Sequence, residues 1–201
     1  MTTKTSPRGR PRSFDKDAAI ATAQQLFHEH GYDGVSVANL GTAMGIKPPS
    51  FYSAFGSKAG LFAEVIARYA DTEGRFTTEA LAGDGRVVDG IERLLLTAAH
   101  IYARQGMKSG CLVLDSTRNS SDIEARTITG GMTDRSRAMV EDYIARDYPD
   151  RARTLSEMVM IAMKGMSSAA RDNASAASLE NFALMAASGF RHEVAQNARN
   201  A

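Results

Sequence analysis

Apolar residues recur at helical spacing along almost the whole chain, and this periodicity constrains its fold more than any other feature. The first stripe consists of Ala19, Ile20, Ala23, Leu26 and Phe27. Its spacing predicts a helix that begins after Asp15 and ends at Gly31, because a glycine commonly terminates a helix. Short apolar runs such as 111–114 lack the paired turn signals of strands. We therefore predict an all-α fold with about nine helices.

Capping residues and helix breakers divide the chain into segments. Ser36 is a good N-cap for a short helix over 37–44, and Gly45 suits the tight turn after it. Pro48 suits the first position of a third helix, over about 48–54, where its missing N–H costs nothing. Ser57 caps a fourth helix, which we expect to run toward residue 81. Later helices are predicted over about 86–105, 111–114, 121–147, 150–171 and 176–196.

The charge of the chain is unevenly distributed. Residues 1–70 carry eight Lys and Arg against five Asp and Glu, which gives +3, whereas residues 71–201 carry sixteen against eighteen, which gives −2. This asymmetry favours a nucleic-acid-binding front on a neutral body. In the segment 1–13, Arg10 and Arg12 alternate with glycine and proline. We expect a flexible arm that enters a DNA minor groove, with a solvated tail as the alternative.

Several classes of protein are excluded by what the sequence lacks. With Cys111 as its single cysteine, the chain cannot form an internal disulfide. It has no apolar leader and no run of 18 apolar residues, so we expect a cytoplasmic protein without a membrane span. Metalloprotease, phosphate-loop and hydrolase motifs are absent, and His28 and His30 point to different faces of one helix. We expect no catalytic residue, no metal and no cofactor.

The segment 36–55 has the composition of a helix-turn-helix. Small and aliphatic residues (Ala38, Leu40 and Ala43) can pack the first helix on the second, and Gly45 permits the sharp turn. The second helix then presents short polar and aromatic side chains to a DNA major groove. Those outer residues are Ser50, Tyr52 and Ser53.

Through residues 10–65 the sequence resembles the tetracycline-repressor (TetR) family of bacterial regulators. The matching residues are Leu26–Phe27, Gly31–Tyr32, Ser36–Val37, Leu40, Gly45–Ile46, Ser50-Phe51-Tyr52, Phe55, Ser57-Lys58 and Leu61. The resemblance implies a DNA-binding domain over 14–60, a recognition helix over 47–55, and a sensing and dimerisation domain over 61–201.

The resemblance also implies a role for individual residues. Lys47, Ser50, Ser53 and Thr42 are expected to contact bases or phosphates, Tyr52 and Lys58 to contact phosphates, and Phe51 and Phe55 to lie in the core. Ser36 and Pro48 are expected at helix N-termini, where the backbone N–H groups that remain free can donate to phosphates. Pro48, Pro49 and Ala54 depart from the usual pattern. Gly60 is expected to cost about 1 kcal/mol relative to alanine inside a helix.

A single short helix reads few base pairs, so we expect a homodimer on a palindromic operator. The last two helices, about 150–171 and 176–196, are rich in small residues and methionine, which suits a dimer interface. The alternative is an ordinary face within one subunit's helical bundle.

Residues 86–171 are expected to enclose a site for an unknown small-molecule effector between helices. Seven of the ten methionines lie from residue 132 onward, which indicates an adaptable lining or a gap-filling core. The candidate ligand-binding residues are His100, Tyr102, Cys111, Asp115, Arg118 and Met163.

The function expected from these patterns is a DNA-binding repressor associated with the bacterial nucleoid and released by a small molecule. As one alternative, Cys111 senses electrophiles or oxidants, because a helix N-terminus lowers the pKa of a thiol. An inert buried thiol is the competing interpretation. A ligand-free architectural DNA-binding protein is a further alternative.

Overall fold

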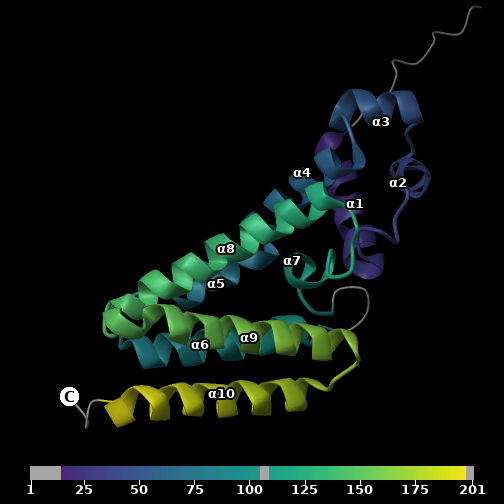
Figure 1. Cartoon of the computed structure of the whole chain (residues 1–201). Coiled ribbons are helices and arrows are strands. Elements are labelled where there is room, and N and C mark those ends of the chain that lie inside the picture. The colour runs from purple at the N-terminus through teal and green to yellow at the C-terminus, as the bar shows by residue number, and fades with distance from the viewer. Residues whose placement is uncertain (1–14, 105–108, 198–201) are drawn as a thin grey trace, which may run out of the picture.

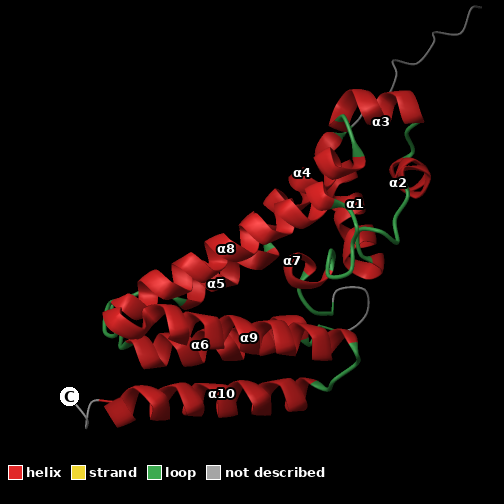
Figure 2. Ribbon diagram, in the orientation of Figure 1, coloured by secondary structure: helices red, strands yellow, loops and turns green. Residues whose placement is uncertain are grey.

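The computed structural model describes residues 15–104 and 109–197 of the chain. Within these ranges every regular element is a helix (Figure 2). The elements are α1 (Lys16–His30), α2 (Val37–Met44), α3 (Pro48–Phe55), α4 (Lys58–Asp71), η1 (Glu73–Arg75), α5 (Phe76–Ala80), α6 (Val87–Tyr102), α7 (Leu112–Asp115), α8 (Ile123–Ala145), η2 (Pro149–Arg151), α9 (Ala152–Arg171) and α10 (Ala176–Asn197). The arm predicted over 1–13, with Arg10 and Arg12, lies outside the described residues.

Local sequence explains most of these helix ends. The Ser36 hydroxyl accepts a hydrogen bond from the Asn39 N–H at 3.0 Å, and the Ser57 hydroxyl accepts one from the Gly60 N–H at 2.9 Å. Pro48 occupies the first position of α3, as predicted. The all-α prediction is confirmed for the described part of the chain.

Two predicted boundaries are wrong. The fourth helix stops at Asp71 instead of continuing toward residue 81, and a 3-10 turn separates it from α5. This break gives ten α-helices in the described ranges instead of about nine. The helix predicted over 121–147 begins at Ile123 instead, because Asp122 is its cap and the Asp122 carboxylate accepts the Ala125 N–H at 3.0 Å.

The helices form an elongated arrangement with two distinct ends (Figure 1). Helices α1, α2 and α3 lie together at one end, and α4 and α8 run from there into the body of the molecule. Helix α10 lies on the opposite side, packed against α6 and α9. One continuous cluster of buried apolar residues extends through the described chain from Ala19 to Val194. No helix in the described ranges is both long and apolar enough to span a lipid bilayer.

Helix α4 connects the two ends of the molecule. Near its start, the Phe62 ring packs against Phe27 and Tyr32, with ring centroids 5.0 and 4.9 Å apart. Near its end, Tyr69 is buried among residues of the C-terminal helices. The domain boundary predicted at residue 60 therefore falls inside a continuous helix, and a movement of α4 would reach both ends.

Candidate DNA-binding surface and sensing cavity

The turn between α2 and α3 depends on two glycines. Gly45 is left-handed, with φ 66° and ψ 30°, and its N–H donates to the Thr42 carbonyl at 3.2 Å. The Ile46 N–H donates to the Gly41 carbonyl at 2.9 Å. A Cβ at Gly41 would lie 3.0 Å from the Ile46 carbonyl oxygen, so this glycine permits the close approach. Sequence reasoning found Gly45 but missed Gly41, because a glycine inside a helix looks only destabilising.

Helix α3 is attached to the body by its aromatic residues. Phe51 is fully buried and Phe55 nearly so, with their ring centroids 5.5 Å apart, which places both in the core as expected. The other face of α3 is open to solvent, and 52% of Tyr52 is exposed. Of the predicted DNA-contacting residues, those exposed on this end are Ser36, Thr42, Lys47, Pro48, Ser50, Tyr52 and Ser53. The structure thus brings these residues together around one outward-facing helix.

The turn from α3 to α4 requires Gly60. A Cβ at this position would lie only 2.2 Å from the Phe55 carbonyl oxygen, the last carbonyl of α3. The expectation that Gly60 is simply a cost to the helix is therefore wrong. The residue allows α4 to start close beneath the end of α3, and so helps to fix the angle between the two helices.

Lys58 faces the protein as well as solvent. Its ammonium lies 3.9 Å from the centroid of the Tyr32 ring. Partial burial lowers the pKa of Lys58, and the nearby carboxylates of Asp33 and Asp122 oppose that shift. A phosphate contact by Lys58 stays a prediction, and it would compete with this cation–π contact.

A cavity of about 60 Å³ lies in the body of the molecule, between α4, α5, α6, α7, α8 and α9. Three of the predicted ligand-binding residues, Tyr102, Cys111 and Met163, line it. Sequence reasoning missed Tyr69, which also lines it, because its place on the apolar stripe of α4 marks it only as core. Burial raises the pKa of both tyrosines.

Of the two interpretations of Cys111, the surroundings of the thiol agree with the inert buried thiol and not with a lowered pKa. Cys111 is only 7% exposed, and burial raises the pKa of its thiol. Hydrogen bonding from the Tyr69 side chain, and then from the backbone of α7, acts in the opposite direction but is the smaller effect. Helix α7 spans only Leu112–Asp115, so its dipole is small. The thiol is protonated at neutral pH, which makes it a weak nucleophile.

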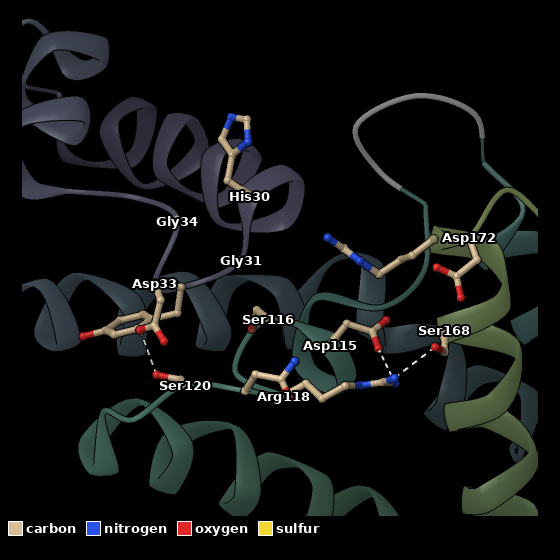
Figure 3. Close-up of a pocket in the computed structure, with 13 residues that line it drawn as sticks. His30, Gly31, Asp33, Gly34, Asp115, Ser116, Arg118, Ser120, Ser168 and Asp172 are labelled. Atoms are coloured by element: carbon tan, nitrogen blue, oxygen red, sulfur yellow. Dashed lines mark hydrogen bonds and ion pairs between the residues drawn. The ribbon is translucent and has the colours of Figure 1, made fainter.

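Asp115 and Arg118 line a different hollow, an open groove of about 500 Å³ between the α1–α2 connection and helices α7 and α9 (Figure 3). The Arg118 guanidinium lies between Asp115, at 2.9 Å, and the Ser168 hydroxyl, at 3.0 Å. On the other side, the Ser120 hydroxyl donates to Asp33 at 2.8 Å. Because these polar groups bond to one another, the groove connects the DNA-binding end to the C-terminal helices. We call this region, with the residues that line the groove, the joint.

Further hydrogen bonds cross the same joint. The Arg171 guanidinium of α9 donates to the carbonyls of His28 and Glu29, at 2.8 and 3.3 Å, near the C-terminus of α1. The Tyr32 N–H donates to the Ser116 carbonyl at 2.8 Å, and the Tyr32 hydroxyl donates to Asp122 at 2.9 Å. These contacts join α1 to α9, and the α1–α2 connection to the segment 116–122.

His100 does not point toward the interior as expected. Its side chain is exposed and lies beside α10, in a shallow hollow with Leu96, Ala176 and Glu180. Position 100 falls at the edge of the apolar stripe of α6, where α10 covers part of the helix. In the described part of the chain, no group of three or more His, Cys, Asp or Glu side chains could hold a metal ion.

Comparison with known proteins agrees with this geometry. Residues 19–65 match the family model of bacterial regulatory proteins of the tetR family. Over 188 residues, the chain is 40% identical to the HTH-type transcriptional repressor BdcR of Escherichia coli K12, covering 92% of this chain and 95% of that protein. The chain belongs to the TetR family. It is therefore a helix-turn-helix DNA-binding regulator of transcription.

Other TetR-family proteins are similar over most of their length. The HTH-type transcriptional repressor ComR of Escherichia coli K12 is 30% identical over 179 residues, covering 84% of this chain and 85% of ComR. Among solved structures, a cysteine mutant of the TetR family regulator CifR, complexed with 26-base-pair operator DNA, has a TM-score of 0.81 at 30% identity. That alignment covers 89% of this chain and 98% of the CifR chain. The TetR fold therefore extends through the C-terminal domain.

Proposed function

We propose that this TetR-family regulator is a repressor that binds a palindromic operator as a homodimer and leaves it when a small molecule occupies the cavity. The observation that carries the proposal is the solvent-exposed face of α3, which buried Phe51 and Phe55 hold at the end of the molecule. The names of BdcR and ComR as repressors, and the operator DNA in the CifR structure, support it.

In this proposal α3 lies in the major groove. Ser50, Ser53, Lys47 and Thr42 contact bases or phosphates, and Tyr52 donates its hydroxyl to a phosphate. That hydroxyl makes no hydrogen bond in the part of the chain that the structure describes, so it is available. The remaining predicted contacts are those of Arg10 and Arg12 in a minor groove, Lys58 to a phosphate, and the helix starts at Ser36 and Pro48.

Dimerisation is supported by apolar side chains exposed on the last two helices. Ile161 on α9 is 69% exposed, and Phe182 and Met185 on α10 are 45% and 73% exposed. Phe182, Met185 and Gly189 follow one another at helical spacing on the face of α10 that points away from α6. A second copy of the chain packed on α9 and α10 would remove these side chains from water, which stabilises association.

Release is supported by the contacts that link the cavity to the joint. The Cys111 N–H donates to the Ser167 hydroxyl at 2.7 Å, and that hydroxyl donates to Asp115, which also binds Arg118 in the groove. A ligand that displaces α7 would disturb this chain of contacts and the Tyr32–Ser116 bond to the DNA-binding end. The ligand then favours a spacing of the two reading helices that does not fit DNA.

A cysteine-based sensor is less well supported than a ligand cavity, because a buried, protonated thiol reacts slowly. The substitution Cys111→Ser separates the two, since oxidant-dependent release requires the sulfur whereas ligand-dependent release does not. As a DNA-binding regulator the protein would act in the bacterial cytoplasm, at the nucleoid.

The proposal is tested by measuring binding to the DNA that flanks the protein's own gene, with a gel-shift assay at low salt. We expect two subunits per site, and loss of both dimerisation and DNA binding in Met185→Lys. Ile123→Lys is a matched control for dimerisation, because Ile123 is equally exposed, at 72%, but lies at the start of α8. Absence of any shift, or a wild-type dimer in Met185→Lys, would contradict the proposal.

A further inference from the structure

The wall of the cavity between α4 and α9 is uncharged throughout the described residues. It consists of aromatic, aliphatic, hydroxyl and sulfur-containing side chains, together with the backbone of Gly74. A charged ligand would lose its hydration there without gaining an opposite charge, which is strongly unfavourable. The chemistry of the wall therefore favours an uncharged occupant.

One polar group in this wall lacks a strong partner. The Tyr69 hydroxyl is buried and bonds to no oxygen or nitrogen atom of the described chain; its polar neighbour is the Cys111 thiol, whose sulfur is only a weak acceptor. The neighbouring hydroxyls of Thr133 and Ser136 already donate to carbonyls of α8, at 2.9 and 3.2 Å. Among these three hydroxyls Tyr69 is the one with a proton available for an occupant, because buried hydroxyls normally donate to a good acceptor.

The rest of the wall fits a small apolar body. Met132, Met160 and Met163 line the cavity, and methionine side chains adapt their shape at little cost. The volume of about 60 Å³ is well below the roughly 300 to 1,000 Å³ of pockets that hold drug-sized ligands, which favours a small occupant. An occupant larger than a few non-hydrogen atoms would have to push these methionines aside.

We propose that the cavity binds a small uncharged molecule with one hydrogen-bond acceptor, such as a ketone or an aldehyde. The acceptor oxygen receives the Tyr69 hydroxyl proton in a hydrogen bond, and the apolar part lies against the methionines. This inference rests on the proposed function, because it names the chemical class of the ligand that releases the protein from DNA.

The test compares probes that share one branched skeleton and differ at a single end. Butan-2-one is neutral with an acceptor, 2-methylbut-1-ene is neutral without one, propionate is an anion and propionamidinium is a cation. Each is titrated into the full-length protein carrying ¹³C-methyl methionine, and the methyl signals are followed by NMR. We expect butan-2-one to shift the Met160 and Met163 signals saturably, to leave the signal of Met139, which does not line the cavity, unchanged, and to bind more tightly than the other three probes.

Two tyrosine variants then test the anchor. Tyr69→Phe should lower the affinity for butan-2-one about two- to tenfold, the loss expected for one hydrogen bond, and leave the affinity for 2-methylbut-1-ene unchanged. Tyr143→Phe is the matched control, because its hydroxyl is also buried without a partner but does not line the cavity. Stronger binding of either charged probe, no saturable binding of any probe, or equal effects of the two variants would overturn the inference.

Operator binding is measured in parallel, so that two failures can be told apart. If butan-2-one binds in the cavity but the protein stays on its DNA, the proposed ligand class is kept and the proposed release by ligand is rejected. If the protein binds its operator but the cavity binds a charged probe more tightly, the proposed repressor function is kept and the proposed ligand class is overturned.

Discussion

Replacing Gly60 by alanine adds one methyl group to the first turn of α4, and two physical effects then oppose each other. Alanine is favoured over glycine inside a helix by about 1 kcal/mol. However, the new Cβ would lie 2.2 Å from the Phe55 carbonyl oxygen, whereas real Cβ contacts are essentially never below 3.0 Å. The two atoms must separate by at least 0.8 Å, the difference between these distances.

The cost of this separation outweighs the gain in helix propensity. The opposing atom is a backbone carbonyl at the end of α3 and cannot rotate away like a flexible side chain. Overpacking of this kind costs about 1 to 3 kcal/mol, and a fixed backbone neighbour favours the upper end. After the helical gain is subtracted, we expect Gly60→Ala to lower the free energy of unfolding by about 2 kcal/mol. It should also weaken DNA binding, because α3 has to move.

Urea denaturation at a fixed protein concentration measures this change, with Gly130→Ala as the control. Gly130 lies exposed within α8, and a Cβ there would meet nothing within 4 Å. Gly130→Ala should therefore raise the free energy of unfolding by about 0.4 to 1 kcal/mol. If both variants stabilise the protein to the same degree, the reasoning is refuted, because Gly60 is then not needed for the close approach of α4 to α3.

Three further predictions concern DNA binding, pH and the joint. Tyr52→Phe should weaken DNA binding alike on all sequences, by about 3 kcal/mol for two lost phosphate contacts per dimer, without changing the salt dependence. Lys47→Gln should instead reduce the slope of log affinity against log salt by about 2. Gel shifts over a salt series distinguish the two variants. Burial lowers the pKa of His28 below its ordinary value of 6.5, so below that pH the unfolded chain binds more protons than the folded one. The free energy of unfolding should fall as the pH drops below 6.5, and urea titrations of His28→Gln should show a smaller fall; an unchanged slope would refute this. Arg171→Met removes the hydrogen bonds to the C-terminal carbonyls of α1 and should lower the free energy of unfolding by about 1 to 2 kcal/mol. Arg153→Met, which removes an exposed ion pair, should lower it little in the same urea titration.

The DNA-binding end could be predicted in detail because its signals are local. The caps at Ser36 and Ser57 and the proline at the start of α3 act within one helical turn, so sequence spacing is enough to find them. The buried aromatic pair of α3 also follows from helical spacing. The family resemblance over these residues then gave the function.

The sensing half could be predicted only as a set of helices. Tyr69, Cys111 and Met163 come from three separate elements, and they form one cavity only because the helices pack around it. Asp115 and Arg118 lie close to Cys111 in the chain, yet they face the groove instead of the cavity. The direction of the Cys111 pKa shift likewise depended on burial by distant helices.

The sequence by itself determined most of the helices and the caps at Ser36 and Ser57, since each depends on residues within a few positions of one another. Tertiary structure alone decided that Gly60 meets the end of α3, that Asp122 joins Tyr32 across the joint, and that a tyrosine hydroxyl in the cavity wall has no oxygen or nitrogen partner. The physical reason is that side-chain burial and close contact depend on distances between segments far apart in the chain, which helical periodicity does not specify.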